Sequence, residues 1–435
     1  MNNRYRISLL ATLFILTAAS LLRAQPSVDS AAKRLVLRDK RLFDSIAIRR
    51  DTTFRRDETH PLPEHLPGSW SPEFPTNFAR RPLLKMEDSP PFLLNYDRAD
   101  GFFLGVGDNL PATQFLEKRI QGYFGFGYAF GSHYWQVYGG LSRDFLSTTT
   151  PLRIGGEGHI LTDTRDAWKV ERFENSLDAL LAGVDSRDYY QRKGYSLSIE
   201  QFLSPRIGVR GEFRSDRYIN SRREVGWSLF GPKQPFRDVQ GIQEGRLTSA
   251  AVGLVMDFMS LRSWSETEFG LETEAEWGSL DGRFAQYVLD LRLKTVAIDP
   301  WLSLAVHGRV GSATGAAPLQ KLFTIGGWGT LPGYPQNAYQ GNRMALLQTD
   351  LLIAPFADSR FLHNLRVIFS NDFGAVTTAD SAAGPLAGIP TDPALFLYSP
   401  GIYVGTPAGQ FRIGYAFRTD IFRDPRLIIR LNQVF

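Results

Sequence analysis

The clearest array of ionisable side chains is a run of acids between residues 266 and 276. Glutamates occupy alternate positions there, namely Glu266, Glu268, Glu272, Glu274 and Glu276. Successive side chains of a β-strand point to opposite faces, so these carboxylates would share one face. Such a row could bind cations, or it could pair with arginines on other strands. Arginines recur in the same way in the segment 206–214. We therefore favour a solvated network of ion pairs.

Residues that could form a catalytic centre are scattered. The chain has no G-x-S-x-G, H-E-x-x-H or G-x-x-x-x-G-K-[ST] pattern. Its six histidines stand far apart, at positions 60, 65, 133, 159, 307 and 363. A Ser–His hydrolase needs the two side chains next to each other with a third group to orient the histidine. We expect no enzyme activity, no cofactor and no metal, and we place each histidine in a polar interior or at its rim.

Most of the chain from Gly101 to Phe435 alternates between apolar and polar residues. The segment 410–420 shows this most clearly, with one apolar face made of Phe411, Ile413, Tyr415 and Phe417. Soluble sandwiches alternate too, with the apolar face inside. Segments of about 10 to 12 residues suit tilted strands that cross lipid. Clustered aromatics also suit membrane interfaces, and such a cluster is formed by Tyr123, Phe124, Phe126, Tyr128 and Phe130. Both features favour an apolar face turned toward lipid.

The alternating segments predict an all-β fold, a transmembrane antiparallel β-barrel of about sixteen strands. The long connections follow odd-numbered strands, and short ones follow even-numbered strands, as expected for external loops and periplasmic turns. The long connections are 173–191, 218–244, 311–342 and 374–395. The expected strands are 101–107, 120–130, 133–143, 152–161, 166–172, 192–203, 206–217, 245–258, 266–277, 283–296, 300–310, 343–354, 363–373, 396–405, 409–419 and 426–435.

The N-terminal part differs from the rest. Residues 1–24 have a basic start, an apolar run and small residues near the end, which predicts a cleaved signal peptide; a transmembrane anchor is the alternative. Residues 25–95 are rich in proline toward their end and are interpreted as a periplasmic tail or linker. Residues 96–435 would then form the barrel, in the outer membrane of a Gram-negative cell. The net charge of +4 is evenly interspersed, so no nucleic-acid partner is expected.

The segments 321–356 and 367–376 carry the most specific pattern. The first has glycines ahead of an apolar strand, and the second reads VIFSNDFGAV. Together they resemble the bacterial surface antigen (BamA–TamA) superfamily of outer-membrane barrels, in which F-x-x-G-G precedes an R-G-[FY] loop tip and a wall strand carries an aromatic–Asp–x–Gly stretch. The positions corresponding to these are Phe323, Gly326, Gly327, Leu331, Pro332, Gly333, Tyr334, Asp372 and Gly374, with Phe369 displaced by one residue.

The resemblance implies that the loop between strands 11 and 12 folds into the barrel. The glycines permit positive φ and close backbone approach, which fits such a loop. In the family the tip arginine contacts an inward aspartate, but Pro332 stands at that position here. Arg343 is one candidate to replace the contact with Asp372. The alternative is that Asp372 is an ordinary lumen carboxylate.

The resemblance also implies a role in outer-membrane protein assembly or translocation. Partners would be membrane lipid, unfolded outer-membrane or secreted proteins, and periplasmic lipoproteins. Family members carry compact periplasmic repeats before the barrel, and the prolines of residues 25–95 argue against one here. The alternative function is a passive pore or a structural barrel without insertase activity.

The first and last predicted strands should close the barrel. Ile429, Leu431 and Phe435 share one face of the last strand, and a terminal aromatic is an outer-membrane targeting feature of such strands. We expect this strand to pair with the glycine-rich strand 101–107, leaving a weak junction that in the family opens laterally; the alternative is a barrel that simply starts with a flexible strand. Residues 173–184 have helical spacing and predict a packed helix in an external loop.

Overall fold

The computed structural model describes residues 92–110, 120–146, 150–204, 207–231, 236–259, 266–299, 301–356, 362–406, 411–420 and 425–430. The predicted signal peptide and almost all of the predicted linker lie outside these residues, as do Leu431 and Phe435. Among the residues described, no helix is long and apolar enough to cross a bilayer.

A single antiparallel sheet of sixteen strands dominates the structure, which confirms the predicted fold class. Neighbouring strands follow one another along the chain, except that β12 and β13 leave the sheet and pair with each other. The strands are β1 Phe92–Asp97, β2 Gly101–Leu110, β3 Ile120–Ala129, β4 Tyr134–Leu146, β5 Pro151–Thr164, β6 Tyr189–Ser204, β7 Ile207–Asn220, β8 Gly245–Met259, β9 Glu266–Ser279, β10 Arg283–Asp299, β11 Leu302–Gly315, β12 Phe323–Ile325, β13 Tyr339–Gly341, β14 Arg343–Ile353, β15 Arg366–Thr377, β16 Leu397–Gly405, β17 Arg412–Ala416 and β18 Arg426–Arg430. The helices are α3 Arg172–Ala182 and two short 3-10 turns, η2 Leu319–Lys321 and η3 Pro393–Leu395.

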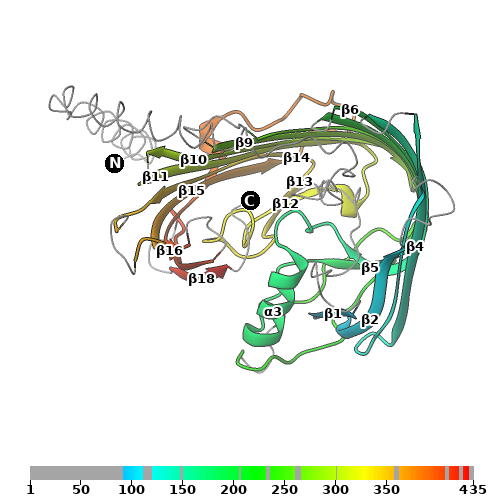
Figure 1. Ribbon diagram of the computed structural model, residues 1–435, viewed down its shortest axis with the longest axis horizontal. Coiled ribbons are helices and arrows are strands. Elements are labelled where there is room, and N and C mark those ends of the chain that lie inside the picture. Colours follow the sequence, from blue (N-terminus) through cyan, green and yellow to red (C-terminus); the bar gives the residue numbers. More distant parts are fainter. Residues whose placement is uncertain are drawn as a thin grey trace, which may run out of the picture. The chain divides into compact units, whose positions relative to one another are not determined.

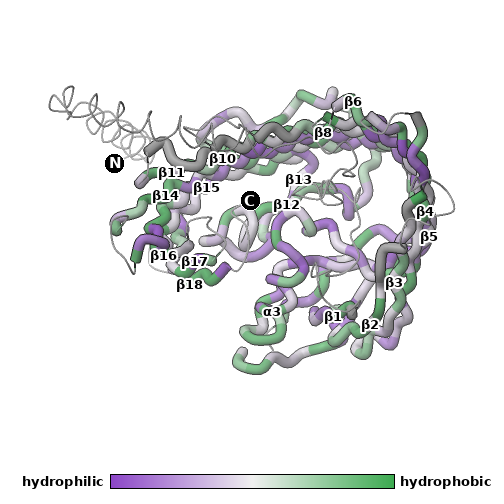
Figure 2. Tube along the Cα trace, viewed as in Figure 1, coloured by the Kyte–Doolittle hydropathy of each residue, from purple (hydrophilic) through white to green (hydrophobic). Residues whose placement is uncertain are grey.

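The strands curve around a space that holds α3, β12 and β13 (Figure 1). Hydrophilic and hydrophobic residues alternate along the strands (Figure 2). The convex face exposes large apolar side chains, such as Leu104, Leu141 and Leu197. The concave face buries charge, and the largest fully buried side chains include Arg98, Arg192, Arg214, Arg309 and Arg343. This is the reverse of a soluble sandwich, and it places the apolar face where lipid would lie.

The first strand of the sheet was not predicted. β1 begins at Phe92, inside the range assigned to the linker, and it pairs with β2 from Phe92↔Val106 to Asp97↔Gly101. The predicted strand 166–172 is wrong, because this segment leaves the wall and ends in the first turn of α3. The two errors cancel in the strand count, so the long loop still connects the eleventh and twelfth strands of the sheet, β11 and β14.

The long connections keep the predicted parity, but the turn 130–133, which the sequence placed after the second strand, follows the third strand of the sheet. Long loops after β5, β7, β11 and β15 all lie at one end of the sheet, while the opposite end carries the shorter connections. β1 starts, and β18 finishes, at the end with short connections. Because outer-membrane barrels carry their long loops outside, this asymmetry predicts that the long-loop end is external.

Candidate functional site: the plug and the seam

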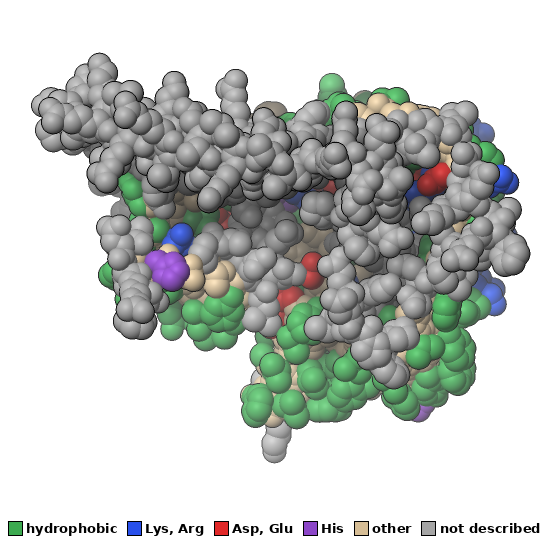
Figure 3. All heavy atoms as spheres, in the orientation of Figure 1, with side chains coloured by type: hydrophobic (Ala, Val, Ile, Leu, Met, Phe, Trp, Pro, Cys, Tyr) green, Lys and Arg blue, Asp and Glu red, His purple; other side chains and the backbone are tan. Residues whose placement is uncertain are grey.

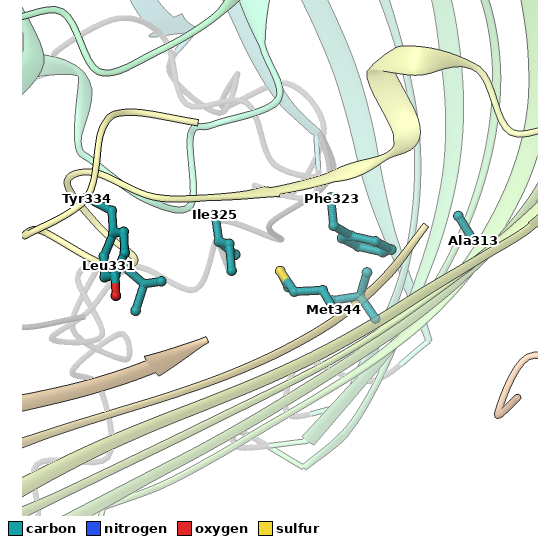
Figure 4. Packing of buried hydrophobic residues seen from close by; sticks show 7 residues of the cluster. Ala313, Phe323, Ile325, Leu331, Tyr334 and Met344 are labelled. Carbon is teal, nitrogen blue, oxygen red and sulfur yellow. The ribbon is translucent and has the colours of Figure 1, made fainter. Parts of the chain in front are cut away.

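The connection between β11 and β14 folds against the concave face of the sheet. Its residues Phe323, Ile325, Leu331 and Tyr334 are buried and pack with Met344 and Ala313 of the wall. Figure 4 shows Phe323 and Ile325 pointing from this connection toward the strand that carries Met344. An apolar cluster inside an otherwise polar interior holds the loop in place, because its burial stabilises the inserted position.

The tip of this loop reaches the last strands of the sheet. The backbone N–H of Gly333 donates to Ser399 Oγ at 2.9 Å, and Arg426 Nη1 of β18 donates to the Tyr334 carbonyl at 2.9 Å. The guanidinium of Arg418 lies 5.0 Å from the centre of the Tyr334 ring. The predicted tip residues are therefore brought together against β16 to β18.

Asp372 lies beside this tip without a direct ion pair to it. Gln348 Nε2 donates to Asp372 Oδ1 at 3.3 Å and to the Thr330 carbonyl at 3.1 Å, so one amide bridges wall and loop. Ser370 Oγ also donates to Asp372, at 3.2 Å. Gly374 lies two residues further along the same strand. Its lack of a side chain leaves room for Ile325 and Leu331 of the loop, each of which would lie only 3.3 Å from a Cβ at this position.

A small cavity separates Pro332 from Asp372. Its volume is about 30 Å³, enough for one or two water molecules. Arg412 and Asp350 line it as well, and Arg412 Nη1 lies 2.7 Å from Asp350 Oδ2. Arg412 of the wall thus lies at the cavity between Pro332 and Asp372, where the family resemblance would place the arginine of the loop tip.

Arg343 does not provide the missing contact. Its guanidinium donates to the carbonyls of Ala387 at 2.8 Å, Asn342 at 3.1 Å and Gly384 at 3.3 Å. Because Arg343 is the first residue of β14, it serves the loops at the long-loop end. The hypothesis that Arg343 pairs with Asp372 is wrong.

A second inserted segment, residues 165–171, was predicted as part of the wall. The Arg309 guanidinium lies 4.0 Å from the Trp168 ring centre, and Val170 is buried. Lys169 Nζ contacts Asp166 Oδ1, Thr324 Oγ1 and Asn337 Oδ1, each at 2.7 Å. Trp168 and Val170 alternate as in a strand, which explains the mistaken prediction. We call residues 165–171, 183–188 and 316–342 together the plug.

The plug is held by buried charge as well as by apolar packing. Although burial alone would raise the pKa of Asp166, Lys169 and Arg165 hold that pKa well below its usual range. Asn337 Nδ2 donates to Asp166 at 3.1 Å and to Asp188 at 2.8 Å. Gly329 adopts φ +79° against the Lys169 carbonyl, and a Cβ there would overlap that oxygen. The two inserted segments therefore form one unit.

Helix α3 lies in the space between β1 and β18, which we call the seam. Among the described residues these two strands end the sheet and do not pair with each other. The helix buries Glu174, Asn175, Ser176 and Ala179. It exposes Phe173 and Leu181, so its polar side faces the protein and its apolar side faces outward. Hydrophobic side chains gather over α3, β1 and β2 in Figure 3.

Polar contacts fix α3 to the edge of β1. The backbone N–H of Tyr96 donates to Ser176 Oγ at 3.3 Å, and the same hydroxyl donates to Asn95 Oδ1. An edge strand presents unpaired backbone groups, and a helix side chain here satisfies one of them. Beyond β1, Arg98 Nη2 lies 2.7 Å from Asp188 Oδ1 in the plug.

The opposite side of α3 binds β18. Arg430 Nε lies 2.7 Å from Glu174 Oε1, and both groups are largely buried. Ile428 and Arg430 are buried, while Ile429 is exposed on the outer face; the role of Ile429, Leu431 and Phe435 in targeting stays a prediction. The predicted pairing of the last strand with 101–107 is wrong, because that segment belongs to β2 and is covered by β1 and β3.

One carboxyl of α3 is unfavourably placed. Burial raises the pKa of Asp178 to about 8, and the neighbouring Glu174 adds to the rise. Asp178 Oδ2 is buried and accepts no hydrogen bond among the described residues. The folded protein therefore favours the protonated form of Asp178 more than the unfolded chain does.

Several ion pairs on the inner face of the sheet form the lumen network that the sequence predicts. Glu276 of the acidic row pairs with Lys321 of the plug at 2.6 Å, and Glu274 lies 3.8 Å from Arg214. His159 contacts Asp216 and His307 contacts Asp290, each at 3.0 Å. His133 lies in the turn before β4 and His363 in the connection before β15; His60 and His65 lie outside the described residues. Within the described part of the chain, no group of three or more His, Cys, Asp or Glu residues is placed to hold a metal ion.

The seam helix is the functional element that sequence reasoning missed. Helical spacing in 173–184 was recognised, but its polar side was not connected to the strand ends. A signal was present, because Glu174, Asn175 and Ser176 form a polar patch on a helix whose other residues include Phe173, Leu177 and Leu181.

No protein-family model matches the chain, and no curated protein matches it in sequence. Among solved structures it is similar to BamA from Haemophilus ducreyi lacking POTRA domains 1–3, with 14% identity, 77% of this chain and 67% of that chain covered, and a TM-score of 0.49. It is also similar to CdiB from Acinetobacter baumannii, with 11% identity, 76% and 55% covered, and a TM-score of 0.40. For CdiB from Escherichia coli the identity is 12%, the coverage 77% and 59%, and the TM-score 0.43. The chain thus spans less than two thirds of either CdiB.

Proposed function

We propose that this chain is an outer-membrane barrel of the BamA/TamA-like type that assists the assembly or translocation of polypeptides through its seam. The observation that carries the proposal is the arrangement of α3. Among the described residues, the two end strands of the sheet do not pair with each other, and each contacts this helix, β1 through Ser176 and β18 through Glu174. A helix held by side chains can leave more easily than a strand held by a full backbone ladder.

Displacement of α3 would expose the edges of β1 and β18. Unpaired strand edges bind extended polypeptide by adding a strand, which is the chemistry that assembly of a β-rich client requires. The plug supports this function because it fills the interior and contacts β18 through Arg426 and Tyr334. Clients would be unfolded outer-membrane or secreted proteins, delivered with or without periplasmic lipoproteins.

The test is a disulfide that fixes α3 to β1. The chain has no cysteine, so the double variant Asn95→Cys/Ser176→Cys introduces a single pair at two side chains in contact. Asp144→Cys/Arg153→Cys is the matched control, because these residues are direct partners on strands β4 and β5 that are already paired. The readout is the rate at which an unfolded eight-stranded barrel protein becomes heat-modifiable in vesicles containing the full chain.

Under the proposal, the oxidised seam variant loses its effect on that rate and regains it on reduction, while the control is active in both states. Equal activity of the oxidised and reduced seam variants would overturn it.

Pro332 at the loop tip favours a second candidate, a passive pore or structural barrel without insertase activity. Planar bilayers distinguish the two. Stable, ion-selective conductance of the wild type supports a pore, and small flickering currents support the plugged machine.

A further inference from the structure

The convex face of the sheet has a hollow that the proposed function does not use. Its volume is about 760 Å³, and it crosses β3 to β8. Phe124, Val137 and Tyr195 line it and are 40%, 42% and 47% exposed, so it opens to the outside. The sheet is thinnest at the bottom of the hollow, because Gly139 on β4 and Gly158 on β5 are direct partners and neither has a side chain. A Cβ at Gly158 would meet nothing within 4 Å.

Three cations stand side by side at one end of this hollow. Lys193 pairs in register with Arg217, and Arg217 pairs with Arg246, on β6, β7 and β8. All three are exposed, and all three line the hollow. Among the described residues none of them lies within salt-bridge distance of a carboxylate, although Arg217 acts electrostatically on the exposed Glu244.

This arrangement is unfavourable unless an anion is present. Like charges placed directly opposite each other on neighbouring strands destabilise a sheet. Cations on the inner face of the same strands are neutralised, since Arg192 contacts Asp163 and Asp216 at 2.9 Å, and Arg214 lies 3.4 Å from Glu212. The outer row therefore has a surplus of positive charge that the protein itself does not balance.

The row lies at the height expected for lipid headgroups. Arg246 is the second residue of β8, and Lys193 is the fifth residue of β6, so both are near the long-loop end. Trp277 is exposed on the adjacent β9 near the same end, as in the aromatic belt of membrane barrels. Tyr195, two residues from Lys193, and Phe213 lie with their ring centres 6.5 Å apart and begin the apolar surface below the row.

We propose that this hollow binds a phosphorylated, multiply acylated lipid of the outer leaflet. Its phosphate would contact Lys193, Arg217 and Arg246, since ammonium and guanidinium groups form charge-assisted hydrogen bonds with phosphate oxygens. Its acyl chains would lie over Gly139 and Gly158, between Phe124 and Tyr195. The combination of a cationic row and an apolar hollow selects a lipid over free phosphate.

The experiment measures binding of diphosphoryl lipid A to the purified full chain in neutral detergent by native mass spectrometry. Arg217→Gln is compared with Arg143→Gln, an exposed arginine near the short-connection end of β4. Loss of one interfacial cation weakens binding about fivefold, and the triple variant Lys193→Gln/Arg217→Gln/Arg246→Gln weakens it about a hundredfold. Arg143→Gln leaves it unchanged.

A second pair of variants tests the apolar part. Gly158→Leu fills the hollow, and Gly308→Leu is the matched control, because a Cβ at Gly308 also meets nothing within 4 Å and that glycine does not line the hollow. Under the proposal, Gly158→Leu reduces lipid binding and Gly308→Leu does not. Removing the phosphates from the lipid should weaken its binding to the wild type as much as the triple substitution weakens the binding of diphosphoryl lipid A.

Three results would overturn the proposal. They are equal lipid binding by the triple variant and the wild type, equal binding of the phosphorylated and dephosphorylated lipids, and full competition by millimolar inorganic phosphate. None of these readouts involves client assembly, so this inference and the proposed function can fail independently.

Discussion

Glu174 of α3 and Arg430 of β18 form a two-pronged ion pair across 256 positions of sequence. Arg430 Nε lies 2.7 Å from Glu174 Oε1, and Arg430 Nη2 donates to Oε2 at 3.3 Å. The two residues connect a helix that follows β5 to the last strand of the sheet. Because this pair joins α3 to β18, its strength bears on how firmly the helix is held on the β18 side of the seam.

Replacing one partner should release the helix. Glu174→Gln leaves the Arg430 guanidinium buried without its carboxylate, which costs about 3–5 kcal/mol for a buried pair. We expect faster hydrogen exchange over residues 172–182 and a lower midpoint of heat modifiability. Asp420→Asn is the control, because its pair with Arg418 is exposed and is worth at most about 1 kcal/mol. Equal effects of both variants would show that the buried pair does not hold α3.

The close approach of the loop tip to the wall can be tested at Gly333. A Cβ there would overlap the carbonyl oxygen of Phe417, so Gly333→Ala must displace the tip and break its hydrogen bond to Ser399. We expect a loss of about 1–3 kcal/mol in the free energy of unfolding and larger conductance in planar bilayers. Gly384→Ala is the control, because a Cβ at that position meets nothing. Unchanged conductance of Gly333→Ala would mean that the tip does not restrict the interior.

The cavity at Pro332 gives a prediction about the family-type contact. With about 30 Å³ beside Asp372, there is no room for a guanidinium while Arg412 remains, so Pro332→Arg should destabilise the protein. Pro332→Arg/Arg412→Met should recover part of the loss, because the new arginine can then approach Asp350 and Asp372. A double-mutant cycle on urea unfolding in detergent measures the coupling free energy between the two substitutions. Additive effects on the free energy of unfolding would contradict the proposed competition between the two arginines.

The raised pKa of Asp178 predicts a pH dependence. Its folded-state pKa of about 8 lies above its ordinary value of 3.8, so the folded protein binds the proton more tightly than the unfolded chain does. The contribution of Asp178 to stability is therefore fully present below about pH 4 and is lost as the pH rises through 8. Asp178→Asn should flatten this decline, raising the thermal midpoint by a few degrees at pH 9 and little at pH 5. Parallel profiles for wild type and variant would contradict the assignment.

Much of the wall could be predicted from period-two alternation, as in 410–420, because an apolar outer face and a charged inner face repeat along each strand. β1 was missed because Pro90 and Pro91 stand directly before it and the segment was assigned to the proline-rich linker, although Asn95 and Asp97 alternate with Leu94 and Tyr96 as in a strand. The loop tip was recognised from its sequence motif. The ion pair between Arg412 and Asp350 was not predicted, because the two residues are 62 positions apart and no motif or periodicity connects them.

The position of α3 in the chain also orders the folding of the protein. The helix is made after β5, yet one of its two binding sides needs β18, which is the last described strand to be synthesised. Contacts at such sequence separation carry a large loop-closure entropy and form late. The ion pair between Glu174 and Arg430 therefore cannot form until β18 has been made, so α3 can complete its docking only after almost the whole described sheet has been synthesised.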